Sequence, residues 1–397
     1  MSFASTPSTP APGHTATIYA AVELSSKNWL LAVQAPDRDK ISRHKVPTGD
    51  SDKLIAHLEQ ARARVQDGTD APVNVLTCYE AGRDGFWLHR VLHANGINNQ
   101  IVDPASLLTD QKKKSAKTDK IDVRRILRAL KLWHEGDPEA CRMVHVPTPE
   151  QEDERRVVRE AQRMKKEITG HLNRIGSVIA LHGISTFRPL RRDWRDQLEQ
   201  LKTADGRELP PMLKGEIKRE CERLHHVRDQ LRQLVREDRA RRREAKRSAE
   251  SKAPTDKTAL EQRAELIAHL QLLRGVGEVG ASILVDEVFF RDFRNRQELA
   301  GYVGLTPQPH SSGAKDTDQG LDKAGHALAR WAMIELTWRW LHYQPNSTLS
   351  RWFHDQVGRA RGRLRRIKLI ATARKLLVAF WRYATQGIVP ENAVTTG

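Results

Sequence analysis

Hydrophobic residues in the N-terminal third of the chain alternate with polar ones or form short runs, a pattern typical of strands separated by turns. Three successive strands are expected at ATIYAAVEL, NWLLAVQA and ISRHKVPT, followed by a helix over roughly 52–65. Further along, VNVLTCYE predicts a buried strand, FWLHRVLHA a helix and NQIVDP another strand. A basic helix from Asp119 to Trp133 closes this part of the chain.

Three antiparallel strands followed by alternating helices and strands is the element order of ribonuclease-H-like folds. We therefore expect residues 15–148 to form one α/β domain of this class. The preceding residues 1–14 are rich in Ser, Thr and Pro, which predicts a disordered tail.

The hydrophobic period changes after this domain. From Gln151 to His182 apolar residues recur three and four positions apart, which predicts a long helix. A second seam of this kind runs from Leu224 to Leu234, and an irregular connector over 183–211 joins the two. Residues 149–252 are thus expected to form a coiled-coil arm. Such short seams fit a bundle within one subunit as well as a dimer, and we favour the dimer.

The remaining sequence predicts a mostly helical C-terminal part. Residues 253–260 have the composition of a linker, 261–385 are expected to form a helical domain, and 386–397 a loose polar tail. The whole chain is therefore expected to be multidomain, α/β followed by α.

The net charge of the chain indicates the kind of partner that it binds. The chain carries 67 Lys and Arg against 50 Asp and Glu, a formal net charge of +17. Because the basic residues are clustered, nucleic acid is the expected partner. The three cysteines are far apart, which excludes a disulfide framework and a Cys-x-x-Cys zinc site. The N-terminus lacks the features of a signal peptide and no apolar run could span a bilayer, so a cytoplasmic protein is expected.

Four acidic residues are candidate metal ligands. Glu23 and Glu80 each end a predicted strand, and Asp119 and Asp122 lie three apart at the start of the basic helix, so they share a helix face. Such carboxylates suit Mg²⁺ or Mn²⁺, which can stabilise the entering and leaving oxygens of a phosphoryl transfer. For Asp119 and Asp122 taken alone, a role in the helix N-terminus is an equally good explanation.

Several basic or glycine-rich stretches are candidate nucleic-acid contacts. The glycine turn of RGVGEVGASIL resembles a helix-hairpin-helix module, whose backbone N–H groups contact a phosphate, although a glycine triplet alone is a weak signal. A solvated basic face is the alternative for the two charged runs. The candidate residues are Lys112, Lys113, Lys114, Lys117, Lys120, Arg124 and Arg125 around the aspartates, Gly275 and Gly277 in the turn, and Arg361, Arg363, Arg365 and Arg366 before the last helix.

A polar segment, GLTPQPHSSGAKDTDQGLDKAGHALAR, holds Ser311 and Ser312 beside Gly313. Serines in glycine-containing loops usually form turns or caps, and no Ser/His/Asp order is evident. Composition alone leaves this segment without a function.

The chain nevertheless resembles one known family, the DEDD insertion-sequence transposases of bacteria. The matching stretches are AVELSSKNW, YEAGRDGFWLHRVL, KTDKIDVRRIL, RGVGEVGASIL and the GLTP…SSG…KAG segment, and together they cover nearly the whole chain in the family's order. KTDKID and GLTP…SSG…KAG are the specific signals among them.

The resemblance implies an N-terminal RuvC-like domain, a C-terminal serine domain and an enzyme that cuts and rejoins DNA. Glu23, Glu80, Asp119 and Asp122 would hold Mg²⁺, and Ser312, with Ser311 as the alternative, would attack a phosphodiester and form a phosphoserine intermediate. Lys315 and Lys323 of the serine segment would contact nucleic acid. The family further implies a guide RNA made by the element and a homo-oligomer, dimeric or tetrameric, in the bacterial nucleoid.

One residue departs from the family pattern, because the first acid is normally Asp and this chain has Glu23. Three hypotheses therefore stand: an RNA-guided DNA recombinase acting through Ser312, a RuvC-like nuclease that uses metal-bound water, and a catalytically decayed transposase that binds nucleic acid. Loss of activity in Ser312→Ala would distinguish the first from the second.

Overall fold

A computed structural model describes residues 16–36, 38–107, 119–137, 139–312, 315–321 and 325–396, without the side chains of 307–321. The chain divides into two compact units, Met1–Val146 and Pro147–Gly397. Each unit is described by itself below. No helix in the described part of the chain is long and apolar enough to cross a membrane.

The first unit is built on a mixed five-stranded sheet of order β3-β2-β1-β4-β5. β1 pairs with β2 and β2 with β3 in antiparallel fashion, whereas β1–β4 and β4–β5 are parallel. The predicted strands are confirmed. Their bounds are Ala16–Glu23 for β1, Asn28–Gln34 for β2, Ile41–Pro47 for β3, Val73–Glu80 for β4 and Asn98–Val102 for β5.

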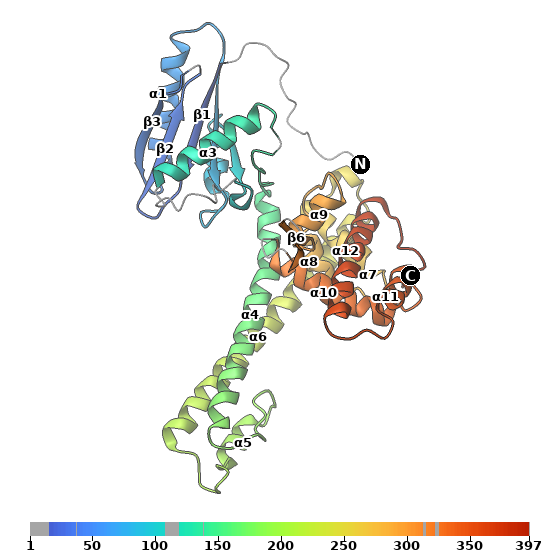
Figure 1. The fold of residues 1–397 in the computed structure, drawn as a ribbon. Helices are drawn as coiled ribbons and strands as arrows, with labels where there is room; N and C mark the ends of the chain where they lie inside the picture. Colours follow the sequence, from blue (N-terminus) through green and yellow to red (C-terminus); the bar gives the residue numbers. More distant parts are fainter. Residues whose placement is uncertain are drawn as a thin grey trace. The chain divides into compact units, whose positions relative to one another are not determined.

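Helices cover both faces of this sheet. α1 (Ser51–Gln66) and α2 (Trp87–Ala94) pack on one face, where Leu54, Leu58, Leu88 and Leu92 join a buried cluster with the sheet. α3 (Asp119–His134) lies across the other face (Figure 1) and buries five of its residues there, from Val123 to Leu130. The polar side of α3 carries Asp119, Lys120 and Arg124 at the surface, while Asp122 and Arg125 are partly buried.

The second unit begins with a helical arm. α4 (Pro149–Ala180) and α6 (Pro211–Ala249) run side by side, and α5 (Trp194–Gln200) lies at the far end (Figure 1). A capping box at Thr148 fixes the start of α4. A buried cluster that includes Ile175, Trp194 and Leu224 packs the far end. The two predicted seams therefore pack against each other within one chain, and pairing with a second subunit stays a prediction.

The C-terminal helices surround a large apolar core. Buried residues of α7, α8, α9, α10 and α12 form this cluster, and α11 packs against α12. The helix bounds are Ala259–Gln271 for α7, Glu278–Glu287 for α8, Arg296–Val303 for α9, Ala327–Tyr343 for α10, Thr348–Val357 for α11 and Arg363–Gln386 for α12. Two short 3₁₀ helices, η1 (Pro104–Ser106) and η2 (Pro254–Asp256), lie in connecting segments.

A β-hairpin interrupts the mostly helical pattern that was expected for this unit. Strands β6 (Pro307–Ser312) and β7 (Lys315–Leu321) pair as an antiparallel hairpin. Both candidate serines therefore lie in a strand and not in a loop. The hairpin escapes prediction because the sequence PQPHSS–KDTDQGL has no hydrophobic alternation, the main signal of a strand.

Candidate functional site

The ends of two neighbouring strands bring two of the predicted acids together. β1 and β4 are parallel and Val22 pairs with Tyr79, so Glu23 and Glu80 are the next residues along the same register. Side chains alternate along a strand, and Ala21 and Cys78, two positions earlier, pack in the cluster under α3. Both glutamates therefore point to the face of the sheet that α3 covers.

α3 brings a third acid to this place through an arginine. Nη2 of Arg125 donates a hydrogen bond to Oε1 of Glu80 at 3.1 Å and lies 3.7 Å from Oδ1 of Asp122. Val123, Ile126 and the other apolar residues of α3 face the sheet, which fixes the turn that carries Asp122 and Arg125 at the sheet edge. A positive charge thus lies between two carboxylates from different elements.

This arrangement fits a divalent cation in its chemistry. The guanidinium of Arg125 stands where a cation would neutralise Glu80 and Asp122, and Arg125 Nε is buried without a hydrogen-bond partner in the described part of the chain. Asp119, the first residue of α3, is exposed one turn before Asp122. Within the described ranges, no three His, Cys, Asp or Glu side chains are close enough to hold a metal ion. The metal-ligand set therefore stays a prediction.

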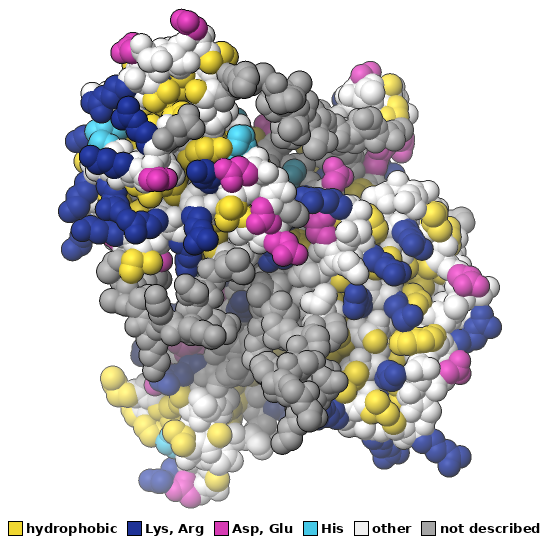
Figure 2. Space-filling model, turned by 45° about the horizontal axis from the view of Figure 1, so that its top comes forward, with side chains coloured by type: hydrophobic (Ala, Val, Ile, Leu, Met, Phe, Trp, Pro, Cys, Tyr) yellow, Lys and Arg dark blue, Asp and Glu magenta, His cyan; other side chains and the backbone are white. Residues whose placement is uncertain are grey.

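The basic residues predicted around these acids are placed only in part. Lys120 and Arg124 are exposed on α3, while Lys112, Lys113, Lys114 and Lys117 lie outside the described residues. On the face shown in Figure 2, Lys and Arg side chains are more numerous than Asp and Glu, in agreement with the net charge of +17.

The candidate nucleophile lies in the β6–β7 hairpin. Ser311 pairs with Asp316 and Ser312 with Lys315, at the end of the two strands. Their side chains, and Lys323, lie outside the described part of the structure. The backbone therefore places Ser312 beside the hairpin turn.

The glycine turn between α7 and α8 has a clear packing role. Gly275 has a φ of +96°, and a Cβ there would lie 3.1 Å from Cβ of Tyr343 on α10. The Gly275 carbonyl accepts a hydrogen bond from Arg339 Nε at 3.0 Å, and Gly277 caps α8. A Cβ at Gly280 would meet the side chain of Leu336. These contacts account for the glycines without a phosphate, so the predicted nucleic-acid contact stays a prediction.

The predicted C-terminal basic patch is exposed. Arg361, Arg363, Arg365 and Arg366 lie in and just before the first turn of α12 and are all exposed. The guanidinium of Arg365 lies over the ring of Trp338 on α10, 5.3 Å from its centroid. The patch therefore includes an aromatic side chain that the sequence reasoning did not single out.

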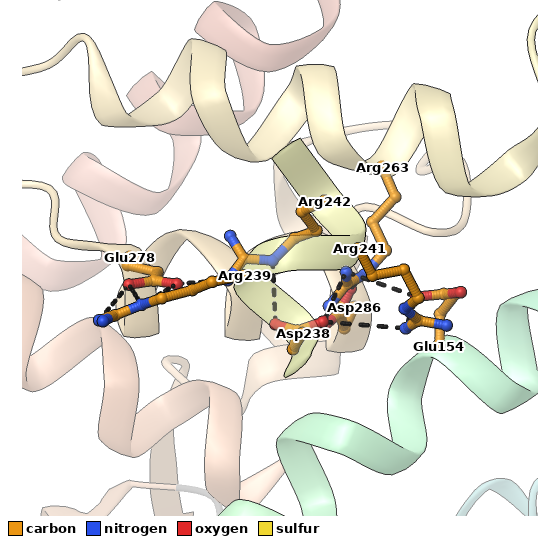
Figure 3. A network of polar contacts seen from close by, with 8 residues as sticks. All are labelled: Glu154, Asp238, Arg239, Arg241, Arg242, Arg263, Glu278 and Asp286. Carbon is orange, nitrogen blue, oxygen red and sulfur yellow. Dashed lines mark hydrogen bonds and ion pairs between the residues drawn. The ribbon is translucent and has the colours of Figure 1, made fainter. Parts of the chain in front are cut away.

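A network of ion pairs inside the second unit was also missed. Figure 3 shows that Glu154 of α4, Arg241 and Asp238 of α6, Arg263 of α7 and Asp286 of α8 form one connected set. Arg263 makes two hydrogen bonds to the Asp286 carboxylate, at 2.6 and 2.8 Å, and both side chains are buried. At one edge, Arg239 and Arg242 pair with Glu278. These contacts fix the base of the arm to the C-terminal helices.

Glu287, the last residue of α8, is the second centre of buried charge. Its carboxylate accepts hydrogen bonds from Arg155 at 2.9 Å and Arg159 at 2.7 Å, both on α4, and lies 3.2 Å from Nε2 of His326. Burial opposes the charged form, but the hydrogen bonds from His326 and Arg159 and the charge of Arg155 outweigh it and hold the pKa of Glu287 well below its usual range. Nδ1 of His326 accepts from the Ala329 N–H and so caps α10.

Comparison with known proteins gives this geometry a context. Residues 267–351 match the family model described as "Transposase IS116/IS110/IS902 family", a stretch that spans the glycine turn, the serine hairpin and α10. The chain is 40% identical over 379 residues to "Putative transposase y4rJ" of Sinorhizobium fredii, which covers 95% of this chain and 94% of that protein.

Two further relatives are more distant. The transposase for insertion sequence element IS1111A of Coxiella burnetii is 25% identical over 79% of this chain and 78% of its own length. The transposase for insertion sequence element IS1328 of Yersinia enterocolitica is 25% identical over 70% of this chain and 74% of its own length. Since these relatives align along most of their length and the first of them at 40% identity, the chain belongs to the IS116/IS110/IS902 family of insertion-sequence transposases.

Proposed function

We propose that this transposase cuts and rejoins DNA with Ser312 as nucleophile, supported by a divalent metal ion at Glu23, Glu80, Asp119 and Asp122. The observation that carries the metal site is the meeting of Glu80 and Asp122 on the guanidinium of Arg125, at the sheet edge that Glu23 also reaches. The sheet order β3-β2-β1-β4-β5, with α3 across one face, supports the ribonuclease-H-like, RuvC-like character of the first unit.

Ser312 is the nucleophile in the proposed reaction. The Ser312 hydroxyl oxygen forms a bond to the phosphorus of a DNA phosphodiester while the bond to one ester oxygen breaks. The serine proton passes to a neighbouring base, and the departing sugar oxygen takes up a proton as it leaves. Glu23, Glu80, Asp119 and Asp122 would hold the divalent ion, which when bound would supply Lewis-acid stabilisation of the charge on the phosphate oxygens. Resolution by the released hydroxyl of another strand restores the serine and rejoins the DNA.

Arg125 would neutralise the carboxylates when no metal ion is bound. In the absence of a divalent ion its guanidinium neutralises Glu80 and Asp122, which limits the repulsion between carboxylates at this edge. Lys120 and Arg124 are exposed on the same helix and would contact the DNA backbone. Recognition of the DNA by an element-encoded guide RNA, and action as a dimer or tetramer, are part of this proposal by family resemblance.

The test is a covalent protein–DNA adduct on a denaturing gel. Purified full-length protein is mixed with Mg²⁺, the RNA flanking its gene and DNA carrying the element junction. We expect an adduct that is lost in Ser312→Ala and in Asp122→Ala, and retained in Ser311→Ala and in Glu59→Ala. Glu59 is a matched control because it is a carboxylate of the same unit that also pairs with an arginine, Arg62.

Three outcomes would contradict the proposal. Metal-dependent DNA breaks without an adduct, unchanged by Ser312→Ala, would identify a nuclease that uses metal-bound water. An adduct lost in Ser311→Ala and retained in Ser312→Ala would move the nucleophile by one residue. Restoration of activity only after Glu23→Asp would identify a decayed enzyme.

A further inference from the structure

One surface of the second unit combines exposed aromatic and basic side chains. Trp331 and Trp338 lie seven residues apart on α10, so they occupy the same helix face about 10 Å from each other along the axis. They are 45% and 41% exposed. Large aromatic side chains are usually buried, and two on one exposed helix face indicate contact with something else.

The start of α12 completes this surface. Arg365 and Arg366 are exposed there, and the apolar side chains of Leu364 and Ile367, which flank them in the sequence, are exposed as well. We call the six residues Trp331, Trp338, Leu364, Arg365, Arg366 and Ile367 the tryptophan–arginine surface.

A small cavity lies where Trp338 meets the start of α12. It has a volume of about 230 Å³ and is lined by Trp338, Gly362, Arg365 and Arg366. The guanidinium of Arg365 lies 5.3 Å from the centroid of the Trp338 ring. A cavity of this size is smaller than sites for drug-sized ligands, which are roughly 300–1,000 Å³, and suits a single flat group.

Charge decides what can occupy the surface. α12 contains no Asp or Glu, and its first turn is rich in arginine. A second copy of this surface would bring arginines against arginines, which opposes a symmetric contact between two copies of the chain. Glu335 lies between the two tryptophans on the exposed face of α10 and offsets part of the positive charge. An anionic partner with flat apolar groups fits both properties, and a nucleic-acid strand has both.

The aromatic side chains also distinguish between forms of nucleic acid. A base can stack on an exposed tryptophan only through a free face, which a paired and stacked base in a duplex does not offer. Each base stacked on an aromatic side chain adds to affinity without a sequence requirement, and arginines track the backbone phosphates. Because the family's substrate is DNA, the strand in question is DNA.

We propose that the tryptophan–arginine surface binds an unpaired DNA strand, with one base on Trp338, a phosphate at Arg365 and Arg366, and a further base on Trp331. The surface would hold a strand that is separated from its complement while the DNA is cut and exchanged. This inference rests on the family's DNA substrate and not on the proposed serine chemistry.

The test measures the affinity of the full-length protein for three fluorescein-labelled probes of about 12 nucleotides. The probes are single-stranded dT, the dT·dA duplex and single-stranded rU, and binding is followed by fluorescence anisotropy. We expect Trp338→Ala to weaken binding of single-stranded dT by roughly 5- to 150-fold, and duplex binding by less than about twofold. Trp338→Phe should retain most of the affinity, since it keeps an aromatic face.

Trp87→Ala is the matched control. Trp87 lies on α2 of the first unit, its exposed fraction of 38% is similar to the 41% of Trp338, and its ring packs against Trp29 with 5.8 Å between the ring centroids. We expect this variant to bind all three probes like the unmodified protein. Glu335→Gln should tighten binding of single-stranded dT, because it removes the negative charge from the surface.

Salt dependence tests the arginines separately. For single strands the slope of log K against log salt is about −0.7 per phosphate contact, so Arg365→Gln with Arg366→Gln, which removes the one proposed phosphate contact, should make the slope shallower by about 0.7. The proposal would be overturned if Trp338→Ala lost as much affinity for the duplex as for single-stranded dT, or if it lost no affinity for either probe. Loss confined to rU would assign the surface to RNA. If Trp338→Ala bound all three probes like the unmodified protein but sedimented as a smaller oligomer, the tryptophan–arginine surface would be an interface between protein chains.

These outcomes are independent of the adduct assay. Loss of the covalent adduct in Ser312→Ala with normal binding of single-stranded dT would support both proposals. Absence of any adduct with the expected Trp338→Ala effect would refute the serine chemistry and leave the strand-binding surface intact.

Discussion

Replacement of Glu287 by alanine tests the idea that buried charge fixes the arm to the C-terminal helices. The Glu287 side chain is fully buried and accepts hydrogen bonds from Arg155 and Arg159 of α4. The Arg155 side chain is 9% exposed, so removal of the carboxylate leaves a buried guanidinium without its counter-charge. Arg159 is 53% exposed and can turn to water.

The magnitude follows from this difference in exposure. Breaking a buried pair by removing one partner costs about 3–5 kcal/mol, while the contact of a half-exposed arginine contributes about 0–1 kcal/mol. We therefore expect Glu287→Ala to lower the free energy of unfolding of the second unit by about 3–5 kcal/mol, nearly all of it through Arg155. Since 1.4 kcal/mol is a factor of ten, the equilibrium constant changes by at least about 100-fold.

The assay is hydrogen exchange of the backbone amides in α4 and α8, with urea unfolding as a second measure. Glu287→Ala should raise exchange near Arg155 and Glu287 and leave the far end of the arm around Trp194 unchanged. The double replacement Glu287→Leu with Arg155→Met should recover most of the loss, because a buried ion pair can be replaced by apolar groups at little cost. A loss below about 1 kcal/mol in Glu287→Ala, or no recovery in the double variant, would refute the reasoning.

Three more predictions follow from the described contacts. Because the folded-state pKa of Glu287 is lowered, its contribution to stability is fully present above its ordinary pKa of 4.5 and is lost progressively as the pH falls from 4.5 toward the lowered pKa. The difference in the free energy of unfolding between wild type and Glu287→Gln, measured by urea unfolding, should therefore shrink as the pH falls below 4.5. Burial raises the pKa of Cys141 to about 11 and of Cys221 to about 12, so at pH 8 these thiols should react with a thiol reagent far more slowly in the folded protein than in urea. Gly275→Ala should destabilise the second unit by about 1–3 kcal/mol, seen as a lower urea midpoint at an unchanged slope, because its φ of +96° strains any other residue and the new Cβ meets Tyr343; a shift below about 0.5 kcal/mol would contradict this.

The strands of the first unit could be predicted because each is a short apolar run between turns. The same runs end at Glu23 and Glu80, and the parallel pairing of β1 with β4 brings those ends together. What the sequence could not show is the position of Arg125, which was grouped with the basic residues that contact nucleic acid. The structure pairs it with Glu80 and Asp122, since the helical spacing of three joins it to Asp122 and packing of α3 brings it to Glu80.

The second unit was harder to predict. Its hairpin has no hydrophobic pattern, and its buried charges pair with residues far along the chain, 23 positions apart for Arg263 and Asp286 and 132 for Arg155 and Glu287. No local signal reports such a pairing. One sign was nonetheless present, because Asp286 and Glu287 end an otherwise apolar stretch, ASILV, and acidic residues on an apolar helix indicate buried partners. Trp338 was likewise overlooked, since a tryptophan in a helix is more often part of a core.

The contacts of His326 have a consequence for proton transfer. This histidine directly follows the KAG motif, so it is a candidate base for the proposed Ser312 nucleophile. Its Nδ1 accepts the Ala329 N–H, so the ring proton resides on Nε2, which faces the Glu287 carboxylate. Both ring nitrogens are therefore engaged in holding α10 and α8. A proton taken up at Nδ1 would break the helix cap, so His326 is a poor acceptor for the proton of the proposed Ser312 nucleophile, and under the proposed mechanism another group would accept it.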